Sequence, residues 1–225
     1  MSKKIKMVIF DMAGTTVNED NIVYKTVQKA INEAGYNFTL DEVLAEGAGK
    51  EKLQAIKSIL STYADNTDIA LAQDIYSNFS VQLDEAYETA ELLPQPNATE
   101  LFSALKERNI FRVLNTGYSR EVAQLIIDKL EWKQGMEFDE LVTATDVTGG
   151  RPEPDMIVFA ADKFGITTSE VIKVGDSIID IEEGQNAGCA LSIGITTGAH
   201  TPEQLQTANP DYIIDNLMEL LPIID

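Results

Sequence analysis

Apolar runs rich in β-branched residues alternate with helical patterns along most of the chain. The run Met7–Phe10 is apolar at every position, which is typical of a parallel strand covered by helices on both faces. Val122, Ile126 and Leu130 recur at helical spacing between two such runs. This alternation predicts an α/β fold with a doubly wound, Rossmann-like parallel sheet. The predicted strands are Ile5–Phe10, Ile110–Leu114, Glu140–Ala144, Val171–Val174, Leu191–Ile195 and Tyr212–Ile214.

One stretch interrupts the alternation. From about residue 18 to residue 90 the chain has helical patterns and no convincing strand. Gly35 is placed to end a first helix there, and Thr39 and Glu42 have the spacing of a capping box that begins the next one. We therefore predict a catalytic core formed by residues 1–16 and 93–225, with an all-helical cap formed by residues 17–92.

The charge of the chain limits its partners. Its 225 residues include 37 acidic and 17 basic ones, so the formal net charge is −20. Such a charge repels nucleic-acid backbones and anionic membrane surfaces, and we expect neither as a partner. It also repels small anions, so an enzyme with this charge that acts on a phosphorylated substrate requires a bound cation.

The cysteine content and the apolar segments indicate where the protein is located. Cys189 is the single cysteine, so no disulfide forms within the chain, which suits a reducing compartment. The apolar run Met7–Phe10 is too short for a signal sequence, and no segment reaches the length of about 20 apolar residues that a membrane span needs. We expect a cytoplasmic protein, and the sequence leaves a homodimer open.

Four polar motifs follow four of the predicted strands in chain order. Ligands bind beyond the carboxyl ends of the strands in an open α/β sheet, so these positions are the first candidates for a site. Each motif alone also has an ordinary structural interpretation, as a turn, a helix cap or a surface arginine. Their order favours a single site. The motifs are DMAGTT (11–16), NTGYSR (115–120), GGRPEPD (149–155) and GDSIID (175–180).

The first and last motifs supply a nucleophile and a metal site. A carboxylate such as that of Asp11 can divide phosphoryl transfer into two steps through an aspartyl-phosphate. The approach of an anion to a phosphate requires charge neutralisation, which Mg²⁺ provides when one or two carboxylates hold it. The predicted ligands are the carboxylates of Asp11 and Asp176 and the backbone carbonyl of Ala13, with Asp180 supporting the metal site.

The middle motifs supply groups that hold the phosphoryl oxygens. The Thr116 hydroxyl and the Gly117 backbone N–H are predicted to lie where a helix begins, which favours anion binding. Arg151 is predicted to bind a phosphoryl oxygen and to stabilise the charge on the nucleophile.

With these motifs the chain resembles the haloacid dehalogenase superfamily over nearly its whole length, and within it the phosphonoacetaldehyde hydrolases (phosphonatases) and their relatives. Most phosphatases of the superfamily have a second aspartate at the position of Ala13, whereas phosphonatases are similar to this chain in Ala13, Tyr118 and Arg151. The resemblance implies a Mg²⁺-dependent hydrolase in which Tyr118 contacts the substrate. It is carried by DMAGTT (11–16), TGYSRE (116–121), GGRP (149–152) and IKVGDSIIDIEEGQNAG (172–188).

The resemblance also implies a lysine in the cap. Phosphonatases form a Schiff base between such a lysine and an aldehyde, which provides the electron sink for cleavage of the C–P bond. Lys50 is the best positional match, although its alignment needs a one-residue gap and Leu53 stands where the family has a histidine. Gly47 and Gly49 are typical of a cap loop that approaches the substrate closely.

The predicted function is hydrolysis of a small phosphonate of the phosphonoacetaldehyde type. Ala13 leaves two alternatives open. One is a phosphatase of a small metabolite such as phosphoglycolate or a sugar phosphate, and the other is a degenerate, binding member of the superfamily. A phospho-acceptor module similar to a receiver domain is disfavoured, because such modules are shorter and lack a helical insert.

Overall fold

The computed structural model describes residues 4–225, so residues 1–3 of the predicted core lie outside the described part of the chain. A six-stranded parallel sheet forms its centre, with the strand order β5-β4-β1-β6-β7-β8. All six predicted strands are present, and the fold class is confirmed. The strands are β1 (Met7–Asp11), β4 (Phe111–Thr116), β5 (Glu140–Thr143), β6 (Val171–Gly175), β7 (Leu191–Ile195) and β8 (Tyr212–Ile214).

Both faces of the sheet are covered by helices. Val8 and Phe10 of β1 pack into one apolar cluster, whereas Met7 and Ile9 pack into a second cluster on the opposite face. This explains the uninterrupted apolar run in the sequence, since every side chain of the strand is removed from water. The surrounding helices are α5 (Ala98–Glu107), α6 (Arg120–Lys129), α7 (Asp155–Lys163), α8 (Ile178–Asn186), α9 (Pro202–Thr207) and α10 (Leu220–Ile224), with short 3-10 helices η1 (Ala144–Asp146), η2 (Thr168–Glu170) and η3 (Leu217–Glu219).

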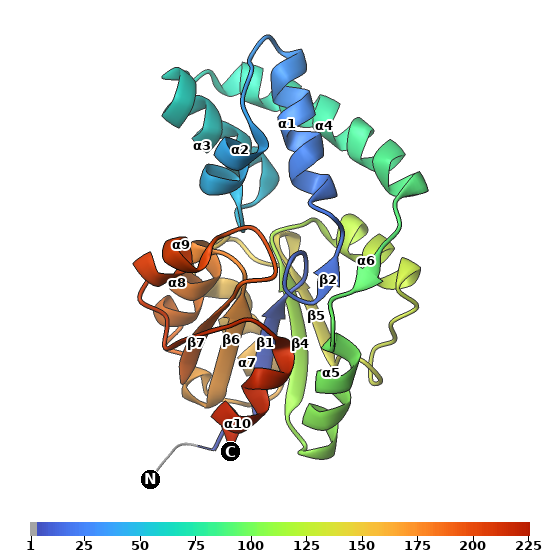
Figure 1. Cartoon of the computed structure of the whole chain (residues 1–225), viewed down its shortest axis with the longest axis vertical. Coiled ribbons are helices and arrows are strands. Elements are labelled where there is room, and N and C mark those ends of the chain that lie inside the picture. Colours follow the sequence, from blue (N-terminus) through green and yellow to red (C-terminus); the bar gives the residue numbers. More distant parts are fainter. Residues whose placement is uncertain (1–3) are drawn as a thin grey trace.

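The helical insert lies beyond the carboxyl ends of the strands, while the C-terminus lies at the opposite end of the sheet (Figure 1). The predicted capping box is confirmed, with the Thr39 hydroxyl accepting from the Glu42 backbone N–H at 3.3 Å. Gly35 follows the first helix with a φ of 102°, a conformation that suits glycine. The insert consists of α1 (Ile22–Glu33), α2 (Leu40–Gly47), α3 (Lys52–Ala64) and α4 (Ile69–Thr89).

Two connections join the insert to the sheet. They form a short antiparallel pair, β2 (Val17–Asn18) and β3 (Leu93–Pro94), which the sequence analysis missed because two-residue strands carry no periodic signal. The division into two domains at residues 16 and 92 stays a prediction. No helix among residues 4–225 has both the length and the apolar character needed to cross a membrane.

Candidate active site

The four predicted motifs meet in one small pocket at the carboxyl ends of β1, β4 and β6. Three residues of the insert complete the pocket: Tyr24, Gly49 and Lys52. The sheet and the loops after its strands contribute Asp11, Ala13, Thr116, Gly117, Tyr118, Arg151 and Asp176. Sequence order alone therefore identified most of the pocket, because parallel strands place their carboxyl ends at one edge of the sheet.

Three buried aspartates could share a cation. Asp11, Asp176 and Asp180 each offer a carboxylate oxygen, and these oxygens lie within 4.8 Å of one another. Asp176 is held in place by the Thr15 hydroxyl, which donates at 3.2 Å, and by the Ala199 backbone N–H, which donates at 2.6 Å. The donor set consists only of oxygens, the ligands that hard divalent cations prefer.

Asp180 differs from the other two aspartates in its contacts. Its Oδ1 lies 3.0 Å from Arg151 and 2.9 Å from Lys173, and its Oδ2 accepts from the Ser177 hydroxyl at 2.5 Å. Asp180 is therefore paired with two cations, whereas Asp176 accepts only from a hydroxyl and a backbone N–H and forms no ion pair in the described part of the chain. The carboxylates that remain available to a cation are those of Asp176 and of Asp11, which pairs with Arg151 through Oδ1, and Asp180 supports the site through the residues that it holds.

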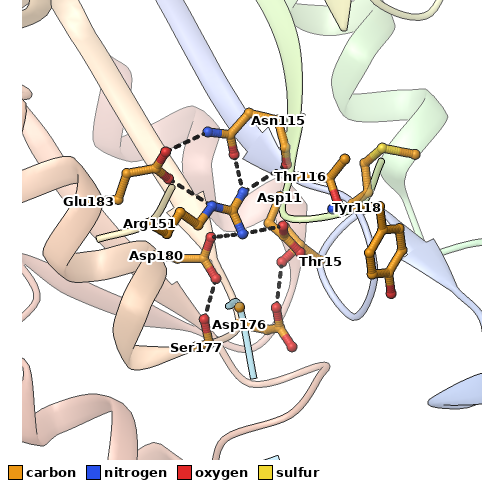
Figure 2. A network of polar contacts seen from close by, with 12 residues as sticks. Asp11, Thr15, Asn115, Thr116, Tyr118, Arg151, Asp176, Ser177, Asp180 and Glu183 are labelled. Atoms are coloured by element: carbon orange, nitrogen blue, oxygen red, sulfur yellow. Dashed lines mark hydrogen bonds and ion pairs between the residues drawn. The ribbon is translucent and has the colours of Figure 1, made fainter. Parts of the chain in front are cut away.

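A buried ion-pair network lies behind the nucleophile candidate (Figure 2). Arg151 donates to Asp11 Oδ1 at 2.7 Å and to the Asn115 carbonyl at 2.8 Å, and its Nε lies 3.0 Å from Glu183. Lys173 lies 3.1 Å from Glu183. We define this network as Asp11, Asn115, Arg151, Lys173, Asp180 and Glu183.

Sequence analysis missed three members of this network: Asn115, Lys173 and Glu183. Lys173 and Glu183 are fully buried. Two signals were present in the sequence. A lysine stands in the middle of the otherwise apolar run Val171–Val174, and Glu183 follows Asp180 at the spacing of one helical turn. A charge in such a run requires a buried partner, because an unpaired charge is costly to remove from water.

Carboxylates outnumber cations at the site. On the sheet side of the pocket, four carboxylates (Asp11, Asp176, Asp180 and Glu183) face two cations (Arg151 and Lys173), which leaves two formal negative charges in excess on that side. Burial raises the pKa of Asp11 to about 6, although the Arg151 guanidinium opposes this shift. Burial, with the nearby charges of Asp11 and Asp180, also raises the pKa of Asp176 well above its usual value. A divalent cation between Asp11 and Asp176 would offset this excess, so the residues fit such an ion.

The lysine at the pocket is Lys52, and the prediction of Lys50 is corrected. The Lys50 ammonium lies 2.8 Å from Glu46 and 3.2 Å from the Ser58 hydroxyl, within the insert. Lys52 is 5% exposed and lines the pocket. The reason lies in the local fold: α2 ends at Gly47 and α3 begins at Lys52, so Lys50 belongs to a connecting turn whose direction spacing does not determine.

Lys52 is held without a carboxylate partner. Its Nζ donates to the Lys50 carbonyl at 2.8 Å and to the Tyr24 hydroxyl at 3.3 Å, and it forms no ion pair in the described part of the chain. It also lies over the rings of Tyr24 and Tyr118, at 4.7 and 5.0 Å from their centres. Burial lowers the pKa of Lys52 to about 8, against the opposing charges of Asp11 and Glu19.

Of the two glycines predicted in a closely approaching cap loop, Gly49 meets the core, whereas Gly47 does not. A Cβ on Gly47 would meet Ile59 at 3.3 Å, so Gly47 packs inside the insert. A Cβ on Gly49 would lie 2.5 Å from the Ser177 hydroxyl, and one on Gly117 would lie 3.0 Å from the Gly49 carbonyl. Backbone therefore meets backbone between the insert and the sheet, which only glycine permits at this separation.

Tyr118 is oriented by a residue that the sequence did not indicate. Its hydroxyl donates to Glu19 at 2.9 Å, and the Tyr87 hydroxyl donates to the same carboxylate at 2.6 Å. Glu19 is buried just after β2. Its carboxylate therefore links three segments by hydrogen bonds: the connection between β2 and α1, the last turns of α4 and the loop after β4. The helix after that loop begins only at Arg120, with Ser119 as its N-cap, so Thr116 and Gly117 precede the helix instead of beginning it.

The fold and the site define the class of protein: a Rossmann-like α/β enzyme with an aspartate cluster at its strand ends and a helical insert above it. The family model for haloacid dehalogenase-like hydrolases matches residues 8–193, and the chain belongs to this family of hydrolases.

Individual relatives agree with this assignment. The chain is 30% identical to a phosphonoacetaldehyde hydrolase from Lactiplantibacillus plantarum, with 98% of this chain and 96% of the relative covered. Among solved structures, a phosphonoacetaldehyde hydrolase-like protein from Oleispira antarctica superposes with a TM-score of 0.84 at 24% identity, covering 99% of this chain and 92% of the other. A predicted phosphoglycolate phosphatase from Haemophilus somnus superposes with a TM-score of 0.80 at 21% identity, covering 98% of both chains. These two structures share the fold.

Proposed function

We propose that the protein hydrolyses the carbon–phosphorus bond of a small phosphonate that carries an aldehyde or ketone, with phosphonoacetaldehyde as the reference compound. One observation carries the proposal: a buried lysine amine, Lys52, lines the same pocket as Asp11 and Ala13. Loss of a carboxylic acid at position 13 removes the group that would protonate an oxygen leaving group, and a buried amine is suited to imine formation instead. The similarity to the phosphonoacetaldehyde hydrolase from Lactiplantibacillus plantarum supports the same reaction.

The residues of the chain have distinct roles in this proposal. Lys52 condenses with the carbonyl carbon and releases water. Asp11 attacks phosphorus, the C–P bond breaks, and its electron pair moves into the iminium to give an enamine. Protonation and hydrolysis of the enamine release the aldehyde and free Lys52, and water hydrolyses the aspartyl-phosphate to inorganic phosphate. Arg151, which donates to Asp11 at 2.7 Å, stabilises the charge as it moves off the nucleophile.

We also propose Mg²⁺ as the cation, held by the carboxylates of Asp11 and Asp176 and by the Ala13 carbonyl. When bound, it neutralises the phosphoryl oxygens and the excess negative charge of the site. The hydroxyl of Thr116 and the N–H of Gly117 bind the remaining phosphoryl oxygens, and Tyr118 contacts the substrate. Residues 17–92 act as a cap that closes over the pocket and excludes water.

A phosphatase of small metabolites, such as phosphoglycolate or a sugar phosphate, is the second candidate. The observation that favours it is the pKa of Lys52 at about 8, which keeps much of the amine protonated at neutral pH. In this reaction the Lys52 ammonium would protonate the leaving oxygen in place of the missing acid at position 13.

Borohydride trapping separates the two candidates. The protein is incubated with phosphonoacetaldehyde and borohydride, and the modified lysine is located by peptide mass spectrometry. We expect irreversible inactivation and an adduct on Lys52, because reduction converts the imine into a stable secondary amine. Lys52→Arg should lose both trapping and C–P cleavage, since a guanidinium is not an amine nucleophile.

Lys50→Arg is the matched control. Its side chain keeps the charge that faces Glu46, so trapping and turnover should stay within about twofold of the unchanged protein. An adduct on Lys50 would reject Lys52 as the imine-forming residue. No adduct together with rapid hydrolysis of a phosphate ester would reject the imine and place the phosphatase first.

A further inference from the structure

A second cavity adjoins the pocket of Asp11. It has a volume of about 380 Å³ and lies between α4 of the insert and α6 of the sheet domain. Three residues border both spaces: Lys52, Gly117 and Tyr118. A substrate with its phosphorus at Asp11 and its next atoms at Lys52 would therefore extend into this cavity.

The walls of the cavity are largely apolar. Tyr76, Phe79 and Leu83 follow one another at helical spacing and present one face of α4, and Val122 of α6 also lines the space. Phe79 and Leu83 are only 3% and 4% exposed. The volume falls within the usual range for small-molecule sites, roughly 300–1,000 Å³. It exceeds what a two-carbon aldehyde needs.

The charges around the cavity are mostly negative. Glu51, Asp84 and Glu121 line it, and Lys52 is the one cation among its described lining residues. Burial and the nearby carboxylates of Glu51 and Glu121 raise the pKa of the Tyr76 hydroxyl, which places these charges close to the apolar wall. A carboxylate on the bound group would be repelled, whereas an ammonium would be attracted.

We infer that this cavity binds the leaving-group end of the substrate, and that this end is an aliphatic chain of several carbons that carries an amine. The inference rests on the proposed function, since it requires a phosphorus centre at Asp11. Within that function it replaces a two-carbon leaving group with a longer, cationic one, and it opposes substrates such as phosphoglycolate whose leaving group is anionic.

The inference is tested by the binding of phosphonates that the enzyme cannot cleave. The result then does not depend on whether the protein breaks a C–P or an O–P bond. Methylphosphonate, butylphosphonate, 4-aminobutylphosphonate and 4-phosphonobutanoate are titrated calorimetrically into the protein with Mg²⁺. Each methylene placed against the walls should tighten binding by about three- to fourfold. The amine should tighten it by about a further threefold relative to butylphosphonate, and the carboxylate should weaken it by a similar factor.

Filling the cavity should remove the chain-length effect. Val122→Phe should weaken binding of butylphosphonate by about 30-fold or more, the product of three methylenes, and leave methylphosphonate unchanged, which also reports that the variant is folded. Val81→Phe is the matched control, because Val81 lies on the outer face of α4 with 59% of its surface exposed. If Val122→Phe does not fold, Leu83→Trp fills the same space from α4. Glu121→Gln should reduce only the preference for the amine.

The outcomes separate the inference from the proposed function. If methylphosphonate and inorganic phosphate bind with Mg²⁺ but length and charge have no effect, the cavity is not a leaving-group site and the proposed function stands. A preference for 4-phosphonobutanoate would overturn the inferred charge of the ligand. If none of the phosphonates binds, the phosphorus site at Asp11 fails, and the inference fails with it.

Discussion

The two sides of the active site hold their cations in opposite ways. On the sheet side, Arg151 and Lys173 are each paired with Asp180 and Glu183, and the attraction of carboxylates raises the pKa of Arg151 although burial opposes it. On the insert side, Lys52 is also buried, but its ammonium contacts phenol rings, a hydroxyl and a carbonyl and forms no ion pair among residues 4–225.

This difference in pairing indicates which of the three cations can take part in a proton transfer or a nucleophilic attack. A paired guanidinium stays charged throughout a reaction and serves electrostatic stabilisation. An unpaired, desolvated amine has a pKa of about 8 and can act as a nucleophile or as an acid near neutral pH. The pocket thus has permanent positive charge on its sheet side and an amine that can gain or lose a proton on its insert side.

The largest effect is expected at the nucleophile, on the sheet side. Asp11→Asn keeps the volume of the side chain but removes its nucleophilic charge, so turnover should fall by about 10⁴-fold or more. Circular dichroism should show an unchanged fold. Retention of more than a few per cent of the activity, measured as phosphate release, would mean that Asp11 is not the nucleophile.

The next largest effect is expected from removal of the bound divalent metal ion. Activity should disappear in EDTA and return with Mg²⁺, because two excess carboxylates would otherwise repel the substrate. Asp176→Asn should raise the Mg²⁺ concentration for half-maximal rate at least about tenfold. Asp162→Asn, on the exposed side of α7, is the control. Full activity in chelator would end the metal proposal.

The ion-pair network should be costly to break. Glu183→Gln removes a buried carboxylate from both Arg151 and Lys173, so the free energy of unfolding should fall by about 3 kcal/mol. The neighbouring Glu182→Gln, at a partly exposed position, should change it by less than about 0.5 kcal/mol. Equal effects in urea unfolding would contradict the contrast between the two sides.

Removal of the Lys52 ammonium, on the insert side, should raise the free energy of unfolding instead of lowering it. Lowering the pKa of Lys52 from 10.5 to about 8 corresponds to a destabilisation of about 3 kcal/mol below pH 8. Lys52→Met should therefore stabilise the fold by about 1–3 kcal/mol at pH 7 while it abolishes C–P cleavage. Because the cost disappears as the folded-state amine deprotonates, the gain should shrink between pH 8 and pH 10.5. A destabilised Lys52→Met at pH 7 would assign Lys52 a structural role.

The smallest effect concerns pH. The neutral amine forms the imine, so the rate of borohydride trapping should rise with pH and level off above about 8. Tyr24 and Tyr118 face Lys52 and stay neutral in this range, because burial raises the pKa of each phenol well above its usual value. A trapping rate that continues to rise toward pH 10 would indicate an exposed, ordinary lysine.

The sequence by itself determined the sheet and most of its site. Period, length and order located all six strands, and polar residues at their carboxyl ends necessarily share one edge of a parallel sheet. Asp11, Thr116, Arg151 and Asp176 could therefore be predicted to meet without knowledge of any distance. The end of the first insert helix at Gly35 and the start of the second at Thr39 followed from glycine and capping-box signals in the same way.

Only the tertiary structure decided which lysine lines the pocket, which glycine meets the core and which buried charges pair. Lys50 and Lys52 are two residues apart, so a change of direction in the turn between α2 and α3 exchanges their surroundings. Glu19 reaches Tyr118 across 99 positions of sequence. Contacts of this kind depend on how one element is placed on another, which no local pattern of residues encodes.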